Sequence, residues 1–261
     1  MPTNIDVDIE SEHPAFHVVD HQRPAAHNEF PFQTRSRLIV ALTSLAAITA
    51  AIDIAAVYFG PRTNVYVFKP LTTVLIIVIA LTVEGERRGY RRLIVAGLCF
   101  SLVGDVLLML PSDQFVPGLL SFLIAHLFYI AAFRSRIKGS TSARTALGCV
   151  AYGSFMLWLL FPRLGDMKLP VSIYLLVILA MAWQALNRWA ITQSRGAMFA
   201  AAGAILFVAS DSMIALHRFF SPFRLAELLI LVTYFTAQWL IAISVAWERG
   251  RPRPLPAGGH D

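Results

Sequence analysis

The chain has 261 residues, of which 57% are hydrophobic and only 15% are charged. Soluble globular domains carry about 25% charged residues, so this composition excludes an ordinary soluble protein and predicts a polytopic membrane protein. The net charge of +6 does not indicate nucleic-acid binding, because arginine between membrane spans is the usual mark of cytoplasmic loops. The sequence contains no RNA- or DNA-binding motif, and we expect no nucleic-acid partner.

Residues 1–34 are polar and proline-containing and have no apolar run, which predicts a disordered cytoplasmic tail rather than a signal peptide. In this tail His13, His17 and His21 lie four residues apart, a spacing that brings them together only on a helix. Nothing else in the tail favours a helix, so we interpret the three histidines as solvated. Residues 249–261 form a short basic tail at the other end of the sequence.

The region 35–248 is predicted to be an all-α transmembrane bundle of eight helices. A helix needs about 20 residues to cross the hydrocarbon core of a bilayer. Eight apolar segments approach this length, although the fourth and fifth are short. They lie at about 38–59, 66–83, 93–110, 118–133, 146–161, 170–186, 197–216 and 226–246.

The distribution of Lys and Arg predicts the orientation in the membrane. Sixteen of these residues lie in the two tails and in the connections after the second, fourth and sixth segments, whereas five lie in the remaining connections. Cytoplasmic loops carry the excess of positive charge. We therefore expect a multi-pass protein of the cell membrane with both termini in the cytoplasm.

The two halves of the chain look duplicated. Aligning Pro70 with Pro170 sets LTTVLIIVIA over VSIYLLVILA, and aligning Asp105 with Asp211 matches the third segment with the seventh. The offsets of 100 and 106 residues nearly agree. This pattern predicts a 4+4 parallel internal repeat, with the two halves in the same orientation.

Two aspartates lie well inside apolar segments. Asp105 stands in Gly97–Leu110 and Asp211 in Gly203–Leu216, and each has a glycine eight residues before it and a small residue immediately before it. A carboxylate inside the bilayer costs roughly 2.5–3.5 kcal/mol on insertion scales. Two aspartates that each carry this cost, in matching sequence contexts, indicate a function. We therefore predict that Asp105 and Asp211 are the two centres of one membrane-embedded site.

Further polar side chains fall at similar depths in the predicted spans. Lipid cannot satisfy such groups, so they must face protein or water, either in a functional cavity or in interhelical hydrogen bonds. We expect the two aspartates to face each other and to line one cavity with Lys69, His126 and Tyr129. Asp53 is isolated, which favours a structural or supporting role. The other polar residues of the spans include Thr72, Thr73, Ser101, Glu227, Tyr234 and Gln238.

Five pieces of sequence occur in a characteristic order: FKPLTT, SLVGDVLLML, GLLSFLIAHLFYIAAF, FVASDSMIALHRF and TYFTAQWLI. Together they resemble the YhhN-type membrane proteins, the lysoplasmalogenase family, over roughly residues 38–246. The resemblance implies eight spans and hydrolysis of the vinyl-ether bond of lysoplasmalogens, which gives a fatty aldehyde and a glycerophosphoethanolamine or glycerophosphocholine. By motif match, the polar site would comprise Lys69, Asp105, His126, Tyr129, Asp211, Tyr234 and Gln238.

These residues also suit that chemistry on their own. Vinyl-ether hydrolysis needs a proton donor for the alkene carbon, an anion near the oxocarbenium-like cation and a base for water. Paired carboxylates can supply these roles, as they do in glycosidases. We predict Asp105, Asp211 and His126 as catalytic residues, with Lys69 as a point charge for the lipid phosphate. The other substrate-binding residues are predicted to be Tyr129, Tyr234 and Gln238.

Two other functions remain open from the sequence. A transporter or lipid-binding protein could use the same cavity without chemistry, although the Gly and Pro interruptions typical of transporters are confined here to the ends of the segments. A zinc hydrolase could use His126, Asp105 and Asp211, but only one histidine lies deep in a segment. We therefore predict no metal site and no cofactor, and expect a lysophospholipid substrate together with membrane lipids as partners.

Overall fold

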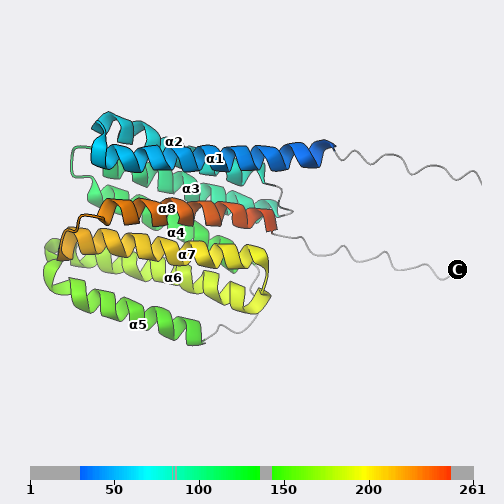
Figure 1. Ribbon diagram of the computed structural model, residues 1–261. Coiled ribbons are helices and arrows are strands. Elements are labelled where there is room, and N and C mark those ends of the chain that lie inside the picture. Colours follow the sequence, from blue (N-terminus) through cyan, green and yellow to red (C-terminus); the bar gives the residue numbers. More distant parts are fainter. Residues whose placement is uncertain (1–29, 84, 86, 136–142, 248–261) are drawn as a thin grey trace, which may run out of the picture.

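The computed structural model describes residues 30–83, 85, 87–135 and 143–247, and the side chains from residue 36 onward. Over these ranges the chain is helical, with no strand (Figure 1). Residues 1–29 of the predicted N-terminal tail, including the three histidines, and the predicted C-terminal tail lie outside the described residues. The main helices are α1 (Phe30–Phe59), α2 (Arg62–Thr82), α3 (Arg88–Met109), α4 (Phe115–Arg134), α5 (Ala143–Leu160), α6 (Lys168–Thr192), α7 (Arg195–Ala215) and α8 (Ala226–Ile243).

All eight main helices are long and apolar enough to cross a membrane, which confirms the predicted all-α bundle. The two segments that looked short in the sequence belong to spans of ordinary length, Phe115–Arg134 and Ala143–Arg163. The first of them begins at Phe115, because Pro117 is tolerated in the first helical turn. In the second, Arg144 and Thr145 of the polar flank belong to the helix. α1 begins at Phe30, within the stretch that the sequence analysis assigned to the tail.

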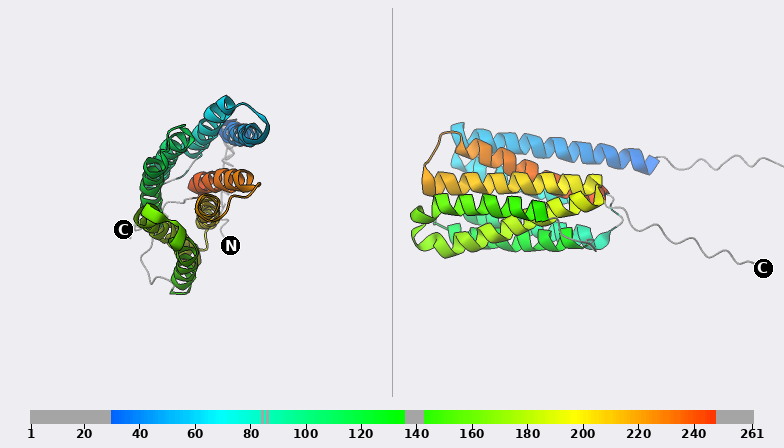
Figure 2. Two further views of the ribbon diagram at one scale, coloured as in Figure 1. Left: turned by 90° about the vertical axis from the view of Figure 1, so that its left-hand side faces the viewer. Right: turned by 90° about the horizontal axis from the view of Figure 1, so that it is seen from below.

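The helices run alongside one another and form an open arc when viewed along their axes (Figure 2). α8 lies on the inner side of this arc and packs against α1, α2, α3 and α7. α4 contacts α6 and thereby joins the two halves, whereas α5 lies at the edge and packs mainly on α6. The central position of α8 brings its polar stripe to the helices that carry the other polar side chains.

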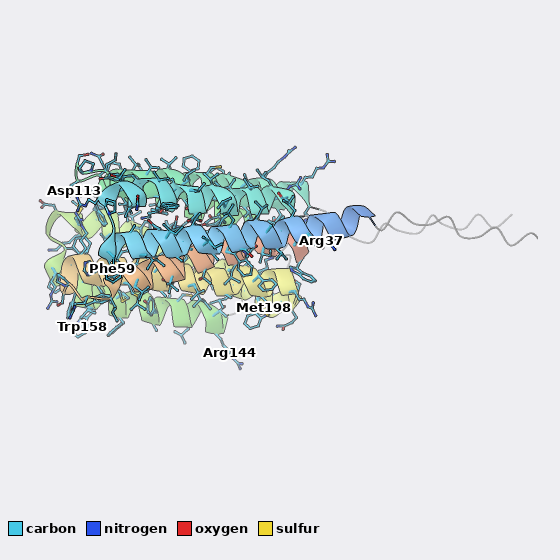
Figure 3. The ribbon with its side chains drawn as sticks, turned by 45° about the horizontal axis from the view of Figure 1, so that its top comes forward. Arg37, Phe59, Asp113, Arg144, Trp158 and Met198 are labelled. Atoms are coloured by element: carbon cyan, nitrogen blue, oxygen red, sulfur yellow. The ribbon has the colours of Figure 1, made fainter. Side chains whose placement is uncertain are left out.

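The two ends of the bundle differ in the residues that mark them. Figure 3 shows Arg37 and Arg144 toward one end, and Phe59, Asp113 and Trp158 toward the other. We call these the Arg37 end and the Asp113 end. Both α1 and α5 start at the Arg37 end, which agrees with parallel halves, but the internal repeat itself stays a prediction.

Glycines explain how the two aspartate-bearing helices approach their neighbours. A Cβ atom on Gly97 of α3 would lie 2.3 Å from the ring of Tyr129 on α4. One on Gly203 of α7 would lie 2.8 Å from Ile241 and 2.9 Å from the carbonyl oxygen of Ala237 on α8. Each glycine stands eight residues before its aspartate, so the shared sequence pattern corresponds to two close helix contacts. These contacts fix the rotation of α3 and α7 about their axes.

One cation was misplaced in the sequence analysis. Arg188 was counted in the connection after the sixth segment, but α6 continues to Thr192 and the Arg188 side chain is buried. Its guanidinium lies 4.6 Å from the centroid of the Tyr90 ring, and the Tyr90 hydroxyl is 2.8 Å from Ser244 Oγ. A planar guanidinium can stack on an aromatic face, and this contact allows the Arg188 side chain to be buried inside the bundle rather than exposed in a loop.

Candidate active site

Asp105 on α3 is the centre of a buried polar network. Its side chain is 1% exposed, and its Oδ2 atom accepts hydrogen bonds from Thr73 Oγ1 at 2.8 Å and from the Tyr234 hydroxyl at 2.7 Å. Lys69 Nζ lies 3.7 Å from Oδ1. The carboxyl group is therefore surrounded by donors and one cation from α2 and α8.

The network continues toward the Arg37 end through α8 and α4. Gln238 donates from Nε2 to the Tyr234 hydroxyl at 2.9 Å, and Tyr129 donates to Gln238 Oε1 at 3.0 Å. Ser101 Oγ lies 3.4 Å from the Tyr129 hydroxyl. Because helices α2, α3, α4 and α8 all contribute, the predicted polar residues Lys69, Asp105, Tyr129, Tyr234 and Gln238 form one connected set, which we call the Asp105 centre.

Asp211 on α7 has a different environment. Its Oδ2 atom accepts a hydrogen bond from the Tyr174 hydroxyl of α6. The side chain is half-buried and lines a small cavity of about 50 Å³ whose walls include Leu108 and Phe122. A cavity of about 10–15 Å³ is enough to hold one water molecule, so the cavity beside Asp211 has room for water next to the carboxyl group. We call Asp211, Tyr174 and this cavity the Asp211 centre.

An aromatic layer lies between the two centres. The His126 ring packs edge-on against Phe207 at 4.8 Å and against Tyr174 at 5.4 Å between centroids. Phe207 also packs at 5.5 Å against Tyr234, which binds Asp105. His126 is fully buried, and neither of its ring nitrogens has a hydrogen-bond partner among the described residues. It is thus a buried polar side chain held by ring packing alone among the described residues.

The expected single cavity is not what the structure shows. Asp211 lines its cavity, whereas Asp105, Lys69, His126 and Tyr129 do not. The two carboxyl groups are close enough for their charges to interact, and Leu108, one helical turn after Asp105, belongs to the cavity wall. The aspartates are neighbours across an aromatic layer rather than partners facing each other, because large rings fill the space between α3 and α7.

Three residues of this region were not among the predicted site residues. Thr73 and Tyr174 donate to Asp105 and Asp211 respectively. The alignment of Pro70 with Pro170 offered a signal, because it places Tyr174 next to the position equivalent to Thr73. Asp53 on α1 is fully buried, and neither carboxyl oxygen has a hydrogen-bond partner among the described residues. Its charge acts mainly on Lys69, so it is less isolated than the sequence indicated.

Over the part of the chain that the structure describes, no group of three His, Cys, Asp or Glu side chains is arranged to hold a metal ion. His126, Asp105 and Asp211, the set considered for zinc, do not form such a group among these residues.

Comparisons with known proteins agree with this architecture. The chain is 29% identical over 200 residues to the uncharacterized membrane protein YhhN of Escherichia coli, which covers 76% of this chain and 95% of that protein. It is 38% identical over 165 residues to the human lysoplasmalogenase TMEM86B, with 63% and 68% covered, and 38% identical over 161 residues to human TMEM86A, also named a lysoplasmalogenase, with 60% and 66% covered. No solved structure matches the chain.

Eight apolar helices around a buried polar centre define a multi-pass membrane protein. The model of the YhhN family matches residues 64–245, and the chain belongs to this family. The resemblance seen in the sequence is thereby confirmed. The matched region contains every predicted site residue and leaves Asp53 of α1 outside it.

Proposed function

We propose that this protein is a membrane lipid hydrolase that cleaves the vinyl-ether bond of lysoplasmalogens. The products are a fatty aldehyde and a glycerophospho-alcohol. The observation that carries the proposal is the pair of neighbouring intramembrane carboxyl groups with unlike surroundings, one beside an ammonium group and one beside a cavity with room for water. Relatives named lysoplasmalogenases support the substrate class.

In this proposal Asp211 acts first as an acid and then as a base. It gives a proton to the alkene carbon that is β to the ether oxygen, which leaves an oxocarbenium ion. Water then adds to the carbon attached to oxygen, and the Asp211 carboxylate takes a proton from it, which gives a hemiacetal. Asp211 suits both steps because it borders the cavity and has one hydroxyl donor, Tyr174, with no cation in ion-pair distance among the described residues. Retaining glycosidases use one carboxyl group in these two roles.

Asp105 supplies the anion that stabilises the cation. Two hydroxyl donors and the Lys69 ammonium hold this carboxylate in place. A fixed anion in a water-poor site stabilises developing positive charge more strongly than it would in water. The faces of the aromatic layer contribute further attraction for a cation.

The remaining predicted residues bind substrate and complete the reaction. Collapse of the hemiacetal to the aldehyde moves one proton from the hemiacetal hydroxyl to the departing glycerol oxygen. We assign this transfer to neutral His126, which takes the hydroxyl proton on one ring nitrogen and gives the proton of the other to the glycerol oxygen; neither nitrogen has a partner among the described residues. Lys69 is 17% exposed and lies toward the Asp113 end, where it can also meet a lipid phosphate. The network of Tyr129, Tyr234 and Gln238 positions the Asp105 carboxylate relative to the ether oxygen of the substrate.

The test is to incubate purified protein with a lysoplasmalogen in detergent and to measure free aldehyde by mass spectrometry. We expect aldehyde and glycerophospho-alcohol in equal amounts, and in D₂O one deuterium on the carbon next to the aldehyde. Tight binding of the lipid without aldehyde would instead support the alternative, a transporter or lipid-binding protein.

We also propose that the Arg37 end faces the cytoplasm, as the excess of positive charge there indicates. After replacement of Cys99 and Cys149 by alanine, single cysteines can be placed at Gly89 and Ser112. Gly89 is suitable because nothing lies within 4 Å of an added Cβ. An impermeant thiol reagent applied to whole cells should label Ser112→Cys and not Gly89→Cys. The reverse pattern would invert the topology.

A further inference from the structure

A groove open to the membrane runs along the surface between α1, α2 and α8. It has a volume of about 370 Å³. Its α1 wall consists largely of alanines, among them Ala47, Ala50 and Ala51. From Ile54 to Thr43 it follows α1 for roughly 16 Å, at about 1.5 Å per residue. Small side chains on one helix thus leave a channel wide enough for a hydrocarbon chain.

The groove adjoins the Asp105 centre through two pairs of consecutive residues. Thr72 lines the groove, while Thr73 binds Asp105. On α8, Phe235 lines the groove, while Tyr234 binds Asp105. Helices α2 and α8 therefore present one face to the carboxylate and the adjoining face to the groove.

Hydrogen bonds fix the depth of the groove relative to the Asp105 centre. Thr72 donates to Thr49 at 2.9 Å, which sets these residues at one level. Trp239 donates to Thr43 at 3.3 Å at the end of the groove nearer the Arg37 end. Thr43 precedes Thr49 by two turns, so the groove extends about 9 Å beyond the level of the carboxylate. Lys69 lies one turn from Thr72 in the opposite direction.

We infer that this groove binds the single alkenyl chain of the lysolipid substrate, an inference that rests on the proposed function. The order along α2 matches the order of groups in such a lipid. Lys69 meets the phosphate, the vinyl-ether carbons lie at the aromatic layer between the Asp105 and Asp211 carboxyl groups, and the groove at Thr72 and Ile76 receives the rest of the chain. Lipid tails are as apolar as the groove, so moving the chain from the bilayer into the groove contributes little hydrophobic free energy. The groove instead holds the chain in a fixed position relative to the reacting groups.

A second groove of about 370 Å³ between α5 and α6 provides an internal comparison. In the alignment of Pro70 with Pro170, Leu169 takes the place of Lys69. Lys168 precedes Leu169, but its ammonium group lies 5.0 Å from the centroid of the Phe161 ring rather than beside a carboxylate that this groove adjoins. We therefore assign the second groove to ordinary bilayer lipid.

The experiment uses a saturated alkyl-ether lysophospholipid that carries a diazirine midway along its chain. This probe cannot be hydrolysed by the proposed reaction, so its binding is measured independently of turnover. After photolysis in detergent, mass spectrometry should locate the crosslink in α1 and α8 at the groove. A diacyl phospholipid with the same diazirine should give at least fivefold less labelling there. Equal labelling by the two probes, or labelling centred on α5 and α6, would overturn the inference.

Two matched substitutions complete the test. Ala47→Phe fills the α1 groove from an exposed position, and Ala146→Phe fills the α5–α6 groove. We expect Ala47→Phe to reduce the α1–α8 crosslink at least fivefold and kcat/KM for a hexadecenyl substrate about tenfold, with Ala146→Phe within twofold of the parent. An unchanged crosslink in Ala47→Phe would contradict the groove. Absence of aldehyde from the parent with a localised crosslink would contradict the proposed reaction alone.

Discussion

The Asp105 and Asp211 centres begin from the same sequence pattern and end in different surroundings. Asp105 is almost fully buried, accepts two hydrogen bonds and faces an ammonium group. Asp211 is half-buried, accepts one hydrogen bond and borders a cavity. The helix preceding each one provides a hydroxyl donor, Thr73 in one case and Tyr174 in the other.

This difference shows how two similar sequence motifs can take separate chemical roles. Two carboxyl groups in identical surroundings would compete for one proton and one charge state. Here a cation lies beside Asp105 only, which favours its role as the anion. Room for water lies beside Asp211 only, which favours its role as acid and base. The substitutions below test that separation, from the largest expected effect to the smallest.

Asp211→Asn should reduce kcat by about 10³- to 10⁴-fold, toward the upper part of the range for general acid–base groups, because it removes both proton transfers. Aldehyde release by protein with a parent-like elution profile is the measurement. A double substitution with Asp105→Asn should be little worse, since the residues act as a unit. Near-normal hydrolysis by Asp211→Asn would end its assignment as the acid.

Asp105→Asn should reduce kcat by about 10²-fold through loss of the stabilising anion. It also leaves the Lys69 ammonium without its partner, and breaking a buried ion pair can cost about 3–5 kcal/mol. Asp105→Asn combined with Lys69→Met should therefore recover thermal stability without recovering activity. Recovery of both would assign Asp105 a structural role.

Tyr174→Phe and Tyr234→Phe each remove one hydroxyl that donates to a carboxyl group. Hydrogen bonds to charged groups contribute about 1.5–3 kcal/mol, so a loss of about 10- to 100-fold in kcat/KM is expected for each. Only Tyr174→Phe should change the solvent isotope effect on aldehyde formation, because only Tyr174 donates to the residue that transfers the proton. Identical isotope effects in the two variants would argue against different roles for the two centres.

Lys69→Ala should mainly raise KM, by about five- to tenfold, with a smaller change in kcat. The reason is that a contact to the phosphate binds the substrate and the transition state equally well. A substrate that lacks the phosphate, an alkenyl glycerol, should show no such rise. If KM for both substrates rises equally, Lys69 serves only to hold Asp105.

Asp53→Asn should have the smallest effect, within about threefold in kcat/KM, since Asp53 makes no hydrogen bond to either centre and acts on Lys69 only through its charge. It should raise the temperature of unfolding, because a buried charge without a hydrogen bond is costly. Activity lost by more than tenfold in stable protein would place Asp53 in the reaction.

Much of this molecule could be predicted from the sequence because hydropathy acts locally. The eight spans follow from apolar segments of sufficient length, and the positions of Asp105 and Asp211 stand out because charge is rare at that depth. The family was also evident, since its motifs surround these residues. The starts of the fourth and fifth spans were less certain, because a proline in the first turn, Pro117, and a polar flank, Arg144 and Thr145, can both belong to a helix.

The partners of the two aspartates were decided only by the tertiary structure. Sequence spacing places Thr73 and Tyr174 on particular helix faces but does not give the rotation of those helices against α3 and α7. Close contacts at Gly97 and Gly203 set that rotation, and aromatic rings then fill the space where the sequence suggested a shared cavity. The sequence by itself determined that two carboxylates enter the membrane. Helix packing, which depends on side chains far apart in the chain, decided that one faces a cation and the other faces space for water.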